Sequence, residues 1–327
     1  MRIVVIGAGA MGSLYGGLLA RSGHEVTLVD RWQEHVYAIR TNGLRLDGIT
    51  GEIQVRPAAA TEASPASAEV ALIQTDTNAT REAAEAAARA LTPEGFAVTL
   101  QNGVGNVETL AEVLGEARVV GGLSYHSALV KAPGQVTHTH AGPTWLGELD
   151  GRPSARVEAL AAAMAGAGFE PVAVDNILGH IWTKFVHNTA INAVCALLGL
   201  RVGEVSMTAG ADALQTRIVE ETLAVVRAKG IALVDADPMA AIKEFCTLKF
   251  NKPSMLQHME AARRTEVDSL NGAVVRFGKE LNIPTPYNEA LMWMVKGMEE
   301  HRMRLKADGP FDYERLEAAA AARAQAS

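Results

Sequence analysis

The feature that most constrains this chain is a glycine-rich turn that directly follows an apolar run at the N-terminus. Residues 2–6 read Arg-Ile-Val-Val-Ile, which predicts a short buried strand. In a strand–turn–helix context Gly7 allows a tight turn, Gly9 lets a pyrophosphate approach the backbone, and Gly12 lets the helix pack closely. The N-terminal part is therefore predicted to bind a dinucleotide through the G-x-G-x-x-G turn, which is Gly7, Ala8, Gly9, Ala10, Met11 and Gly12.

An acidic residue and a basic residue follow the second predicted strand, at 25–30. Asp30 lies 18 residues after Gly12, where a carboxylate accepts hydrogen bonds from the adenosine ribose and favours NADH. Arg31 comes next and is able to pair with the 2′-phosphate of NADPH. The two residues favour opposite cofactors. Asp30 as an ordinary turn residue is the alternative interpretation.

Strands and helices alternate along the first half of the chain. This alternation predicts a mostly parallel sheet covered by helices on both faces. The helical segments include 80–90 and 107–114. The further predicted strands are 70–74, 97–101, 119–123, 135–139 and 144–147.

The pattern changes after residue 175, where only helical periodicity remains. We therefore predict an α/β protein with an N-terminal Rossmann-type doubly wound domain at 1–174 and a C-terminal all-helical domain at 175–327. The predicted helices of the second domain are 177–198, 211–229, 238–248, 255–281 and 287–296.

One of these helices, at 177–198, carries a polar stripe on an otherwise apolar surface. Lys184, Asn188 and Asn192 are spaced four residues apart and therefore share one face. A buried lysine and two buried amides need partners, and a polar ligand would supply them. Burial also lowers the pKa of a lysine, which suits it to proton transfer. The alternative is a structural contact with another domain or subunit.

Two further polar residues are candidates for a site. Glu266 falls on an apolar stripe of the predicted helix 255–281, where a carboxylate is costly unless it is paired. A buried structural ion pair is the alternative. Asn102 directly follows the predicted strand 97–101, and ligands of open α/β sheets bind beyond the carboxyl ends of strands. Its alternative is a role in an Asn-Gly turn.

Composition excludes several functional classes. The net charge of −7 provides no general basic surface for nucleic acid or an anionic membrane. Cys195 and Cys246 match no metal spacing, so we expect a reduced, cytoplasmic protein without a metal site. No apolar stretch approaches the ~20 residues that span a bilayer.

With these motifs in place, the sequence resembles the ketopantoate reductase (2-dehydropantoate 2-reductase) family from Met1 to about Glu300. The resemblance implies hydride transfer from NAD(P)H to the C2 carbonyl of ketopantoate, a step of pantothenate biosynthesis. The motifs that carry it are GAGAMG at 7–12, LQNGVG at 100–105, PG-x-V at 133–136, LGE at 146–148, W-x-K-x-x-x-N-x-x-x-N at 182–192, and PSMLQ followed by TE-x-D-x-x-NG at 253–272.

The resemblance also implies residue roles. Lys184 corresponds to the general acid, and Glu266 to a catalytic carboxylate that also contacts the cofactor. Asn102 corresponds to a residue that contacts both substrate and cofactor, and Ala128 to a backbone contact to the cofactor. The implied substrate-binding residues are Asn102, Asn188, Asn192, Asn251 and Ser254.

The chain also departs from the family pattern. Asp76 stands where many members carry a lysine in the cofactor cleft, which together with Asp30 modestly favours NADH. Ala193 and Cys195 also differ from the pattern after Asn192, and residues 28–35 resemble an NAD-using branch. The alternative function is therefore an NAD-dependent D-2-hydroxy acid dehydrogenase for branched or aromatic substrates.

A non-catalytic dinucleotide-sensing protein is a more remote alternative. A sensor needs no proton donor, so the intact set of polar residues argues against it. Helical second domains of this kind often pair, which leaves a homodimer open.

Overall fold

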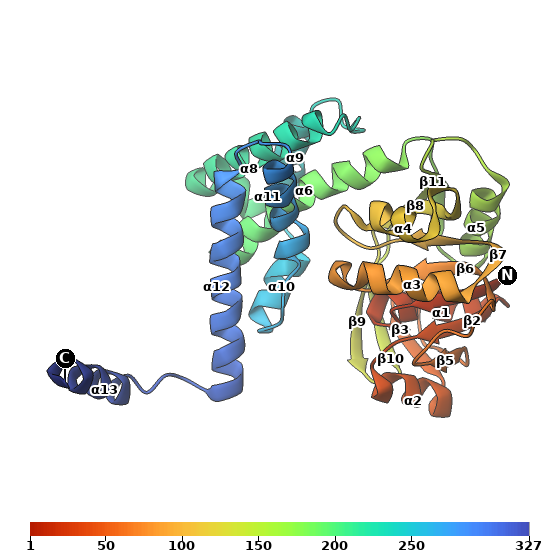
Figure 1. Cartoon of the computed structure of the whole chain (residues 1–327), viewed down its shortest axis with the longest axis horizontal. Helices are drawn as coiled ribbons and strands as arrows, with labels where there is room; N and C mark the ends of the chain where they lie inside the picture. Colours follow the sequence, from red (N-terminus) through yellow and green to blue (C-terminus); the bar gives the residue numbers. More distant parts are fainter. Residues whose placement is uncertain (327) are drawn as a thin grey trace. The chain divides into compact units, whose positions relative to one another are not determined.

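The computed structural model describes residues 1–326, which form two compact units (Figure 1). The first unit is Met1–Phe185 with Gly230–Ala236, and the second is 186–229 with the residues from Asp237 onward. The division falls inside helix α6 (Ile177–Leu198). The predicted domain boundary at 174/175 lies just before this helix and stays a prediction about folding domains.

The first unit contains an eight-stranded sheet in the order β12-β11-β8-β7-β6-β1-β2-β5 (Figure 1). Strands β5 to β8 of this order are parallel, and β11 is antiparallel to β8. From β1 the chain continues to β2 and β5 on one side of β1, and it then places β6, β7 and β8 on the other side. The direction of strand order therefore reverses between β1 and β6. The strands are β1 (Arg2–Ile6), β2 (Glu25–Val29), β5 (Ala58–Ala60), β6 (Ala68–Ile73), β7 (Leu91–Thr99), β8 (Val119–Ser124), β11 (Pro143–Glu148) and β12 (Glu170–Ala173).

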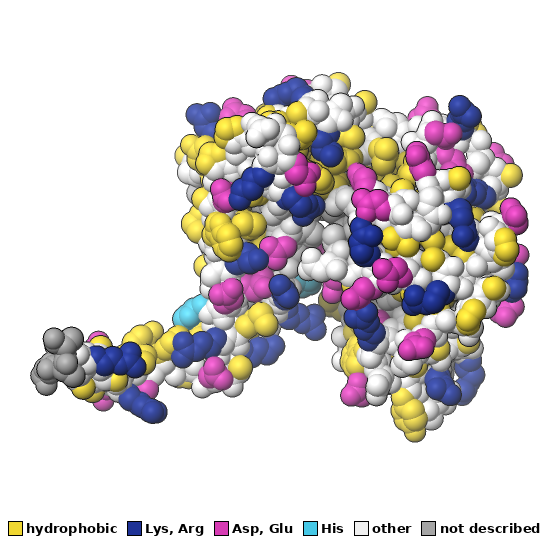
Figure 2. Space-filling model, viewed as in Figure 1, with side chains coloured by type: hydrophobic (Ala, Val, Ile, Leu, Met, Phe, Trp, Pro, Cys, Tyr) yellow, Lys and Arg dark blue, Asp and Glu magenta, His cyan; other side chains and the backbone are white. Residues whose placement is uncertain are grey.

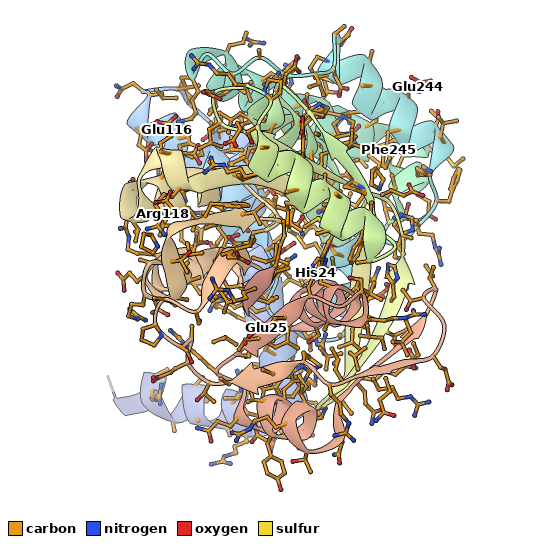
Figure 3. The ribbon with its side chains drawn as sticks, turned by 90° about the vertical axis from the view of Figure 1, so that its right-hand side faces the viewer. His24, Glu25, Glu116, Arg118, Glu244 and Phe245 are labelled. Atoms are coloured by element: carbon orange, nitrogen blue, oxygen red, sulfur yellow. The ribbon has the colours of Figure 1, made fainter. Side chains whose placement is uncertain are left out.

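Helices cover this sheet as the alternation predicted. Helices α3 and α4 pack beside each other, as do α1 and α5, and the strand residues between the layers are buried. Figure 3 labels His24 and Glu25 at the start of β2, the edge opposite the glycine-rich turn. The predicted Rossmann fold is confirmed. The helices are α1 (Ala10–Arg21), α2 (Gln33–Asn42), α3 (Thr80–Ala90), α4 (Asn106–Leu114) and α5 (Ala155–Gly166), with short 3₁₀ turns η1 (Thr77–Ala79) and η2 (Glu116–Arg118).

A second, four-stranded sheet was not predicted from the sequence. Its order is β4-β3-β10-β9, and it packs on α1. The predicted strand 135–139 belongs to it rather than to the main sheet. The other three strands were missed because they are short or half-exposed and lack a continuous apolar run. The strands are β3 (Leu44–Gly48), β4 (Ile53–Val55), β9 (Ser127–Ala132) and β10 (Gln135–His140).

The second unit contains no strand among its described residues, which confirms the all-helical prediction. The single helix predicted at 255–281 is wrong, because Ala262 has a φ of +49° and the chain stays irregular until η3. The residues of the predicted stripe are therefore divided between two separate helices, at 254–260 and 271–280. The elements are α7 (Val202–Met207), α8 (Ala209–Ala228), α9 (Pro238–Leu248), α10 (Ser254–Glu260), η3 (Val267–Ser269), α11 (Asn271–Glu280), α12 (Pro286–Asp308) and α13 (Tyr313–Ala326).

The described surface carries both signs of charge. Figure 2 shows acidic and basic side chains interspersed over the visible face rather than gathered by sign. Within residues 1–326 no helix has the length and apolar character needed to cross a membrane. Cys195 and Cys246 are buried free thiols.

Candidate active site

The glycine-rich turn has the geometry expected of a pyrophosphate cradle. Gly7 has a φ of +92°, and a Cβ built on it would lie 2.6 Å from the Thr75 nitrogen. A Cβ on Gly12 would lie 1.9 Å from the Gly7 carbonyl oxygen. A Cβ on Gly9 would meet nothing within 4 Å. Packing of the protein itself thus requires the outer glycines, whereas Gly9 faces open space at the N-terminus of α1. This arrangement fits a dinucleotide.

A buried histidine holds this turn from behind. The Gly134 amide donates to His35 Nδ1 at 3.1 Å, so Nε2 carries the ring proton. Nε2 lies 3.1 Å from the Ser13 hydroxyl, which donates to the Ala8 carbonyl at 2.7 Å. Burial lowers the pKa of His35, which keeps the ring neutral. His35 was not predicted as a site residue from the sequence, because its partners come from distant segments.

The residues after β2 lie at the same edge of the sheet. The Asp30 carboxylate accepts a hydrogen bond from the Trp32 amide at 2.9 Å. Arg31 forms an ion pair with Glu82, which lies in the first turn of α3. Asp76 is exposed and follows Thr75, the neighbour of Gly7. The cofactor-selecting residues proposed from the sequence therefore flank the glycine-rich turn.

Lys184 is held by two residues at the carboxyl ends of strands. Its Nζ donates to Asn102 Oδ1 at 3.0 Å and to the Ser124 carbonyl at 2.6 Å. The Nζ also lies 4.9 Å from the centroid of the Tyr125 ring. The structure thus brings together Lys184 and Asn102, which the sequence analysis identified separately. It adds Ser124 as the third member of this group.

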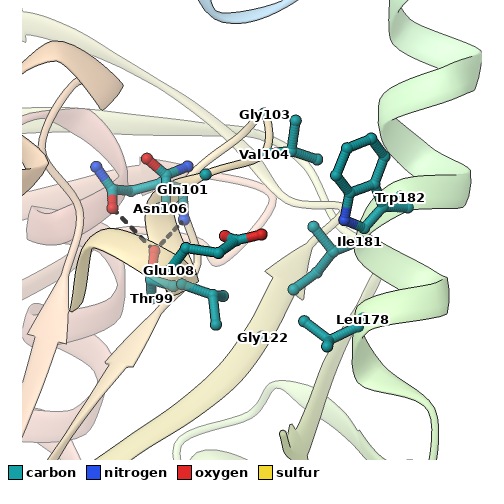
Figure 4. Close-up of a pocket in the computed structure, with 12 residues that line it drawn as sticks. Thr99, Gln101, Gly103, Val104, Asn106, Glu108, Gly122, Leu178, Ile181 and Trp182 are labelled. Atoms are coloured by element: carbon teal, nitrogen blue, oxygen red, sulfur yellow. Dashed lines mark hydrogen bonds between the residues drawn. The ribbon is translucent and has the colours of Figure 1, made fainter. Parts of the chain in front are cut away.

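A polar network fixes the loop that carries Asn102. Thr77 and Asn106 both donate to the Asn102 carbonyl, at 3.1 and 3.0 Å. The preceding Gln101 donates to the Thr75 carbonyl at 2.8 Å. Gln101 also accepts from Thr99 at 2.9 Å (Figure 4). These bonds tie together the ends of β6 and β7 and the start of α4. They hold the backbone of Asn102 in place.

A small pocket opens directly beside this loop. One wall is formed by Thr99, Gln101 and residues 103–108 (Figure 4). The other wall is formed by Leu178, Ile181 and Trp182 of α6, which precede Lys184. Its lining residues Gln101 and Gly103 flank Asn102 in the chain. Trp182, also in the lining, lies two residues before Lys184.

A buried tyrosine connects helix α1 to Ser124. Tyr15 of α1 is fully buried, and its hydroxyl donates to Ser124 Oγ at 2.8 Å and contacts Thr144. Burial raises the pKa of Tyr15 to about 12, so the hydroxyl keeps its proton. Tyr15 and Ser124 were missed by sequence reasoning, because single hydroxyls within apolar runs give no pattern.

The other polar residues of α6 lie in the second unit. The helix covers 177–198 as predicted, and Phe185 and Val186 are buried beside the stripe. Asn192 is 7% exposed, and within residues 1–326 its side chain forms no hydrogen bond. Its amide atoms are not among the fully buried side-chain atoms that lack a partner, so they stay accessible to water or to a ligand. The substrate roles of Asn188 and Asn192 stay predictions.

The remaining predicted residues differ in their surroundings. Asn251 and Ser254 are exposed, and Ser254 begins α10. Glu266 is half-buried and precedes η3, so its placement on a helical stripe is wrong. Within the described chain its carboxylate forms no ion pair. Ala128 lies in β9, opposite His138. The roles of these residues stay predictions.

Comparison with known proteins agrees with this arrangement. The family model "Ketopantoate reductase PanE/ApbA" matches residues 3–151, and its C-terminal counterpart matches 176–299. A 2-dehydropantoate 2-reductase of Pyrococcus horikoshii is 32% identical over 300 residues, covering 91% of this chain and 98% of the relative. One from Halobacterium salinarum is 34% identical, covering 90% of this chain and 98% of the relative.

Solved structures show the same likeness. A PanE/ApbA family ketopantoate reductase from Ralstonia eutropha has a TM-score of 0.82 at 35% identity and covers 92% of this chain and 99% of its own. D-mandelate dehydrogenase in a ternary structure with NADH and anilino(oxo)acetate has a TM-score of 0.83 at 27% identity, with the same coverage. From its motifs, its fold and these relatives, the chain belongs to the ketopantoate reductase family.

Proposed function

We propose that this protein reduces the C2 carbonyl of a small 2-oxo acid with NAD(P)H, converting 2-dehydropantoate (ketopantoate) to pantoate. The observation that carries the proposal is the Lys184 ammonium, held by Asn102 and the Ser124 carbonyl at the carboxyl edge of a nucleotide-binding sheet. A positioned proton donor at this edge suits carbonyl reduction. The curated relatives, which carry the name 2-dehydropantoate 2-reductase, support the same substrate.

In the proposed mechanism Lys184 acts as the general acid. A nicotinamide held by the glycine-rich turn would supply the hydride for C2 of the substrate. Lys184 Nζ gives a proton to the carbonyl oxygen, so the carbon–oxygen π bond is replaced by a C–H and an O–H bond. Asn102 and Ser124 fix the Nζ position. A fixed Nζ keeps the proton aligned with the carbonyl oxygen, and misalignment of reacting groups would lower the rate.

The other residues have binding roles in this proposal. The glycine-rich turn, Asp30 and Ala128 bind the cofactor, and Glu266 contacts the cofactor and assists catalysis. Hydrogen bonds from side-chain amides and a hydroxyl orient the carboxylate and hydroxyl groups of the substrate. The proposed substrate-binding residues are Asn102, Asn188, Asn192, Asn251 and Ser254.

For the cofactor we propose that NADH serves at least as well as NADPH. The Asp30 carboxylate stands where the ribose hydroxyls would dock, and a 2′-phosphate would bring a second negative charge there. Asp76 adds a further carboxylate near the glycine-rich turn. Asp30→Ala should therefore shift the preference toward NADPH. A wild-type kcat/KM for NADPH about tenfold above that for NADH would contradict this proposal.

A second candidate is oxidation of D-2-hydroxy acids with larger side chains. The likeness to D-mandelate dehydrogenase, whose structure contains NADH, favours it. Both candidates are tested by following absorbance at 340 nm with a panel of 2-oxo acids, using NADH and NADPH side by side. Preferential turnover of ketopantoate supports the first, and preferential turnover of an aromatic 2-oxo acid supports the second. Turnover of none overturns the proposed function. The homodimer and the cytoplasmic location stay predictions.

A further inference from the structure

Arg31 is the one candidate receptor for a 2′-phosphate that the sequence offers beside Asp30, and in the structure it is already paired. Its guanidinium forms an ion pair with Glu82 in the first turn of α3. Both side chains are largely solvent-exposed, at 80% and 58%. The pair joins the segment after β2 to the helix after β6. These two segments border the edge of the sheet that carries the glycine-rich turn.

The backbone around Arg31 is held on both sides. The Asp30 amide donates to the Ala60 carbonyl at 3.2 Å, and the Asp30 carboxylate accepts from the Trp32 amide. The Trp32 ring stacks on His35 with centroids 4.9 Å apart, and His35 is the residue that supports the glycine-rich turn. Arg31 therefore leaves a fixed turn, and its side chain extends to α3.

The start of α3 is fixed as well. The Thr80 hydroxyl donates to the Asn106 side chain at 2.9 Å and accepts from Gln101 at 3.0 Å. Glu82 follows two residues later in the same helix, so its backbone starts from a fixed position near Arg31. An ion pair between two anchored segments loses less free energy to the ordering of its side chains than a pair between two mobile segments.

We propose that Glu82 is a specificity-determining residue that selects NADH over NADPH by engaging Arg31. A 2′-phosphate would have to displace the Glu82 carboxylate from Arg31 and would then lie near both Glu82 and Asp30. NADH has no phosphate at this position, so it need not displace Glu82 and brings no added negative charge near the two carboxylates. Its adenine can still stack on the planar guanidinium of Arg31. This inference rests on the proposed cofactor role of the turn, and it extends that role to a residue outside the family motifs.

The test is a binding titration with the full chain and no 2-oxo acid, using quenching of tryptophan fluorescence by NADH and by NADPH. Glu82→Gln should lower the Kd for NADPH by about three- to tenfold, the size expected when one exposed ion pair and one like charge are removed. The Kd for NADH should change by less than about twofold, since no phosphate is involved.

The chain offers a matched control. Arg81 and Glu112 form a similarly exposed ion pair between α3 and α4, and Glu112→Gln removes the same charge from the same protein. This variant should leave the ratio of the two Kd values unchanged. An equal shift in Glu112→Gln would mean that net charge alone sets the ratio, which would overturn the proposal.

A double variant separates engagement of Arg31 from simple repulsion. In an Arg31→Gln background, Glu82→Gln should improve NADPH binding less than it does in the wild type. An equal improvement in both backgrounds, or an unchanged ratio in Glu82→Gln, would overturn the role assigned to Glu82. Failure of the wild type to bind either dinucleotide would instead contradict the proposed function itself.

Discussion

The Nζ of Lys184 lies 3.0 Å from the Oδ1 of Asn102, although 82 positions separate the two residues along the chain. The loop that carries Asn102 is held by Thr77 and Asn106, and the Ser124 carbonyl provides the second acceptor. The Lys184 ammonium, the proposed proton donor, is therefore positioned by residues at the ends of strands.

Removal of the ammonium should abolish most of the activity. Lys184→Ala should lower kcat by about 10²- to 10⁴-fold, the usual contribution of a general acid, while NADH still binds. Steady-state rates at 340 nm and a fluorescence titration check the two parts. Lys279→Ala, which removes an exposed lysine paired with Glu289, should keep wild-type kcat. Near-normal turnover of Lys184→Ala would show that the lysine is structural.

The amides of α6 should affect substrate binding more than the chemical step. Asn188→Ala and Asn192→Ala should each raise KM by roughly 10- to 150-fold, since a lost hydrogen bond to a charged ligand costs ~1.5–3 kcal/mol. Within the described chain the Asn192 side chain has no protein hydrogen bond to lose, so Tm should change little. An unchanged KM in both variants, with ketopantoate varied at saturating NADH, would remove these residues from the site.

Two glycines of the turn should respond differently to the same added methyl group. A Cβ at position 9 meets nothing within 4 Å, so Gly9→Ala should keep its Tm and lose dinucleotide affinity by about tenfold or more. A Cβ at position 12 would lie 1.9 Å from the Gly7 oxygen, so Gly12→Ala should be destabilised by about 1–3 kcal/mol. Thermal unfolding and NADH titration of both variants distinguish the two effects. Unchanged NADH affinity in Gly9→Ala would argue against a cofactor at this turn.

The carboxylate of Glu266 should matter for activity and not for folding. Glu266→Gln keeps the shape of the side chain and removes its charge. Since the carboxylate forms no ion pair among residues 1–326, Tm should stay close to that of the wild type. The rate of 2-oxo acid reduction should fall. A large loss of Tm with preserved activity per folded molecule would indicate a structural role.

The stability of the protein should fall in mild acid. His126 Nδ1 lies 3.0 Å from His138 Nε2, and burial lowers the pKa of His126 from 6.5 to about 4. Between these values the unfolded chain binds a proton that the folded chain does not, so stability is full above pH 6.5 and is lost as the pH falls. Burial also lowers the pKa values of His138 and His35, which act in the same direction.

Thermal unfolding at pH 7 and pH 5 tests this expectation. The wild type should lose Tm between the two, and His126→Gln should lose less because one of the titrating groups is gone. The same Tm at both pH values in the wild type would contradict the assignment.

Local sequence patterns determined the elements with strong periodicity. The apolar run before Gly7, the alternation of strands and helices, and the long apolar helix that carries Lys184 are each encoded by neighbouring residues. They were predicted with boundaries within a few residues of those observed, apart from the longer β7. The polar residues of that helix stand out because they interrupt its apolar periodicity, so the proposed proton donor could be found without a structure.

Tertiary structure decided what depends on residues that are distant in the sequence. The pairing of β3 with β10 joins segments about 90 residues apart, and neither strand carries a long apolar run. The break at Ala262 divides a stripe whose spacing is compatible with one helix, because helical periodicity does not record a positive φ. The acceptors of Lys184 and the partner of Arg31 depend on which strand ends meet at one edge of the sheet. Strand order sets that meeting, and no local pattern encodes it.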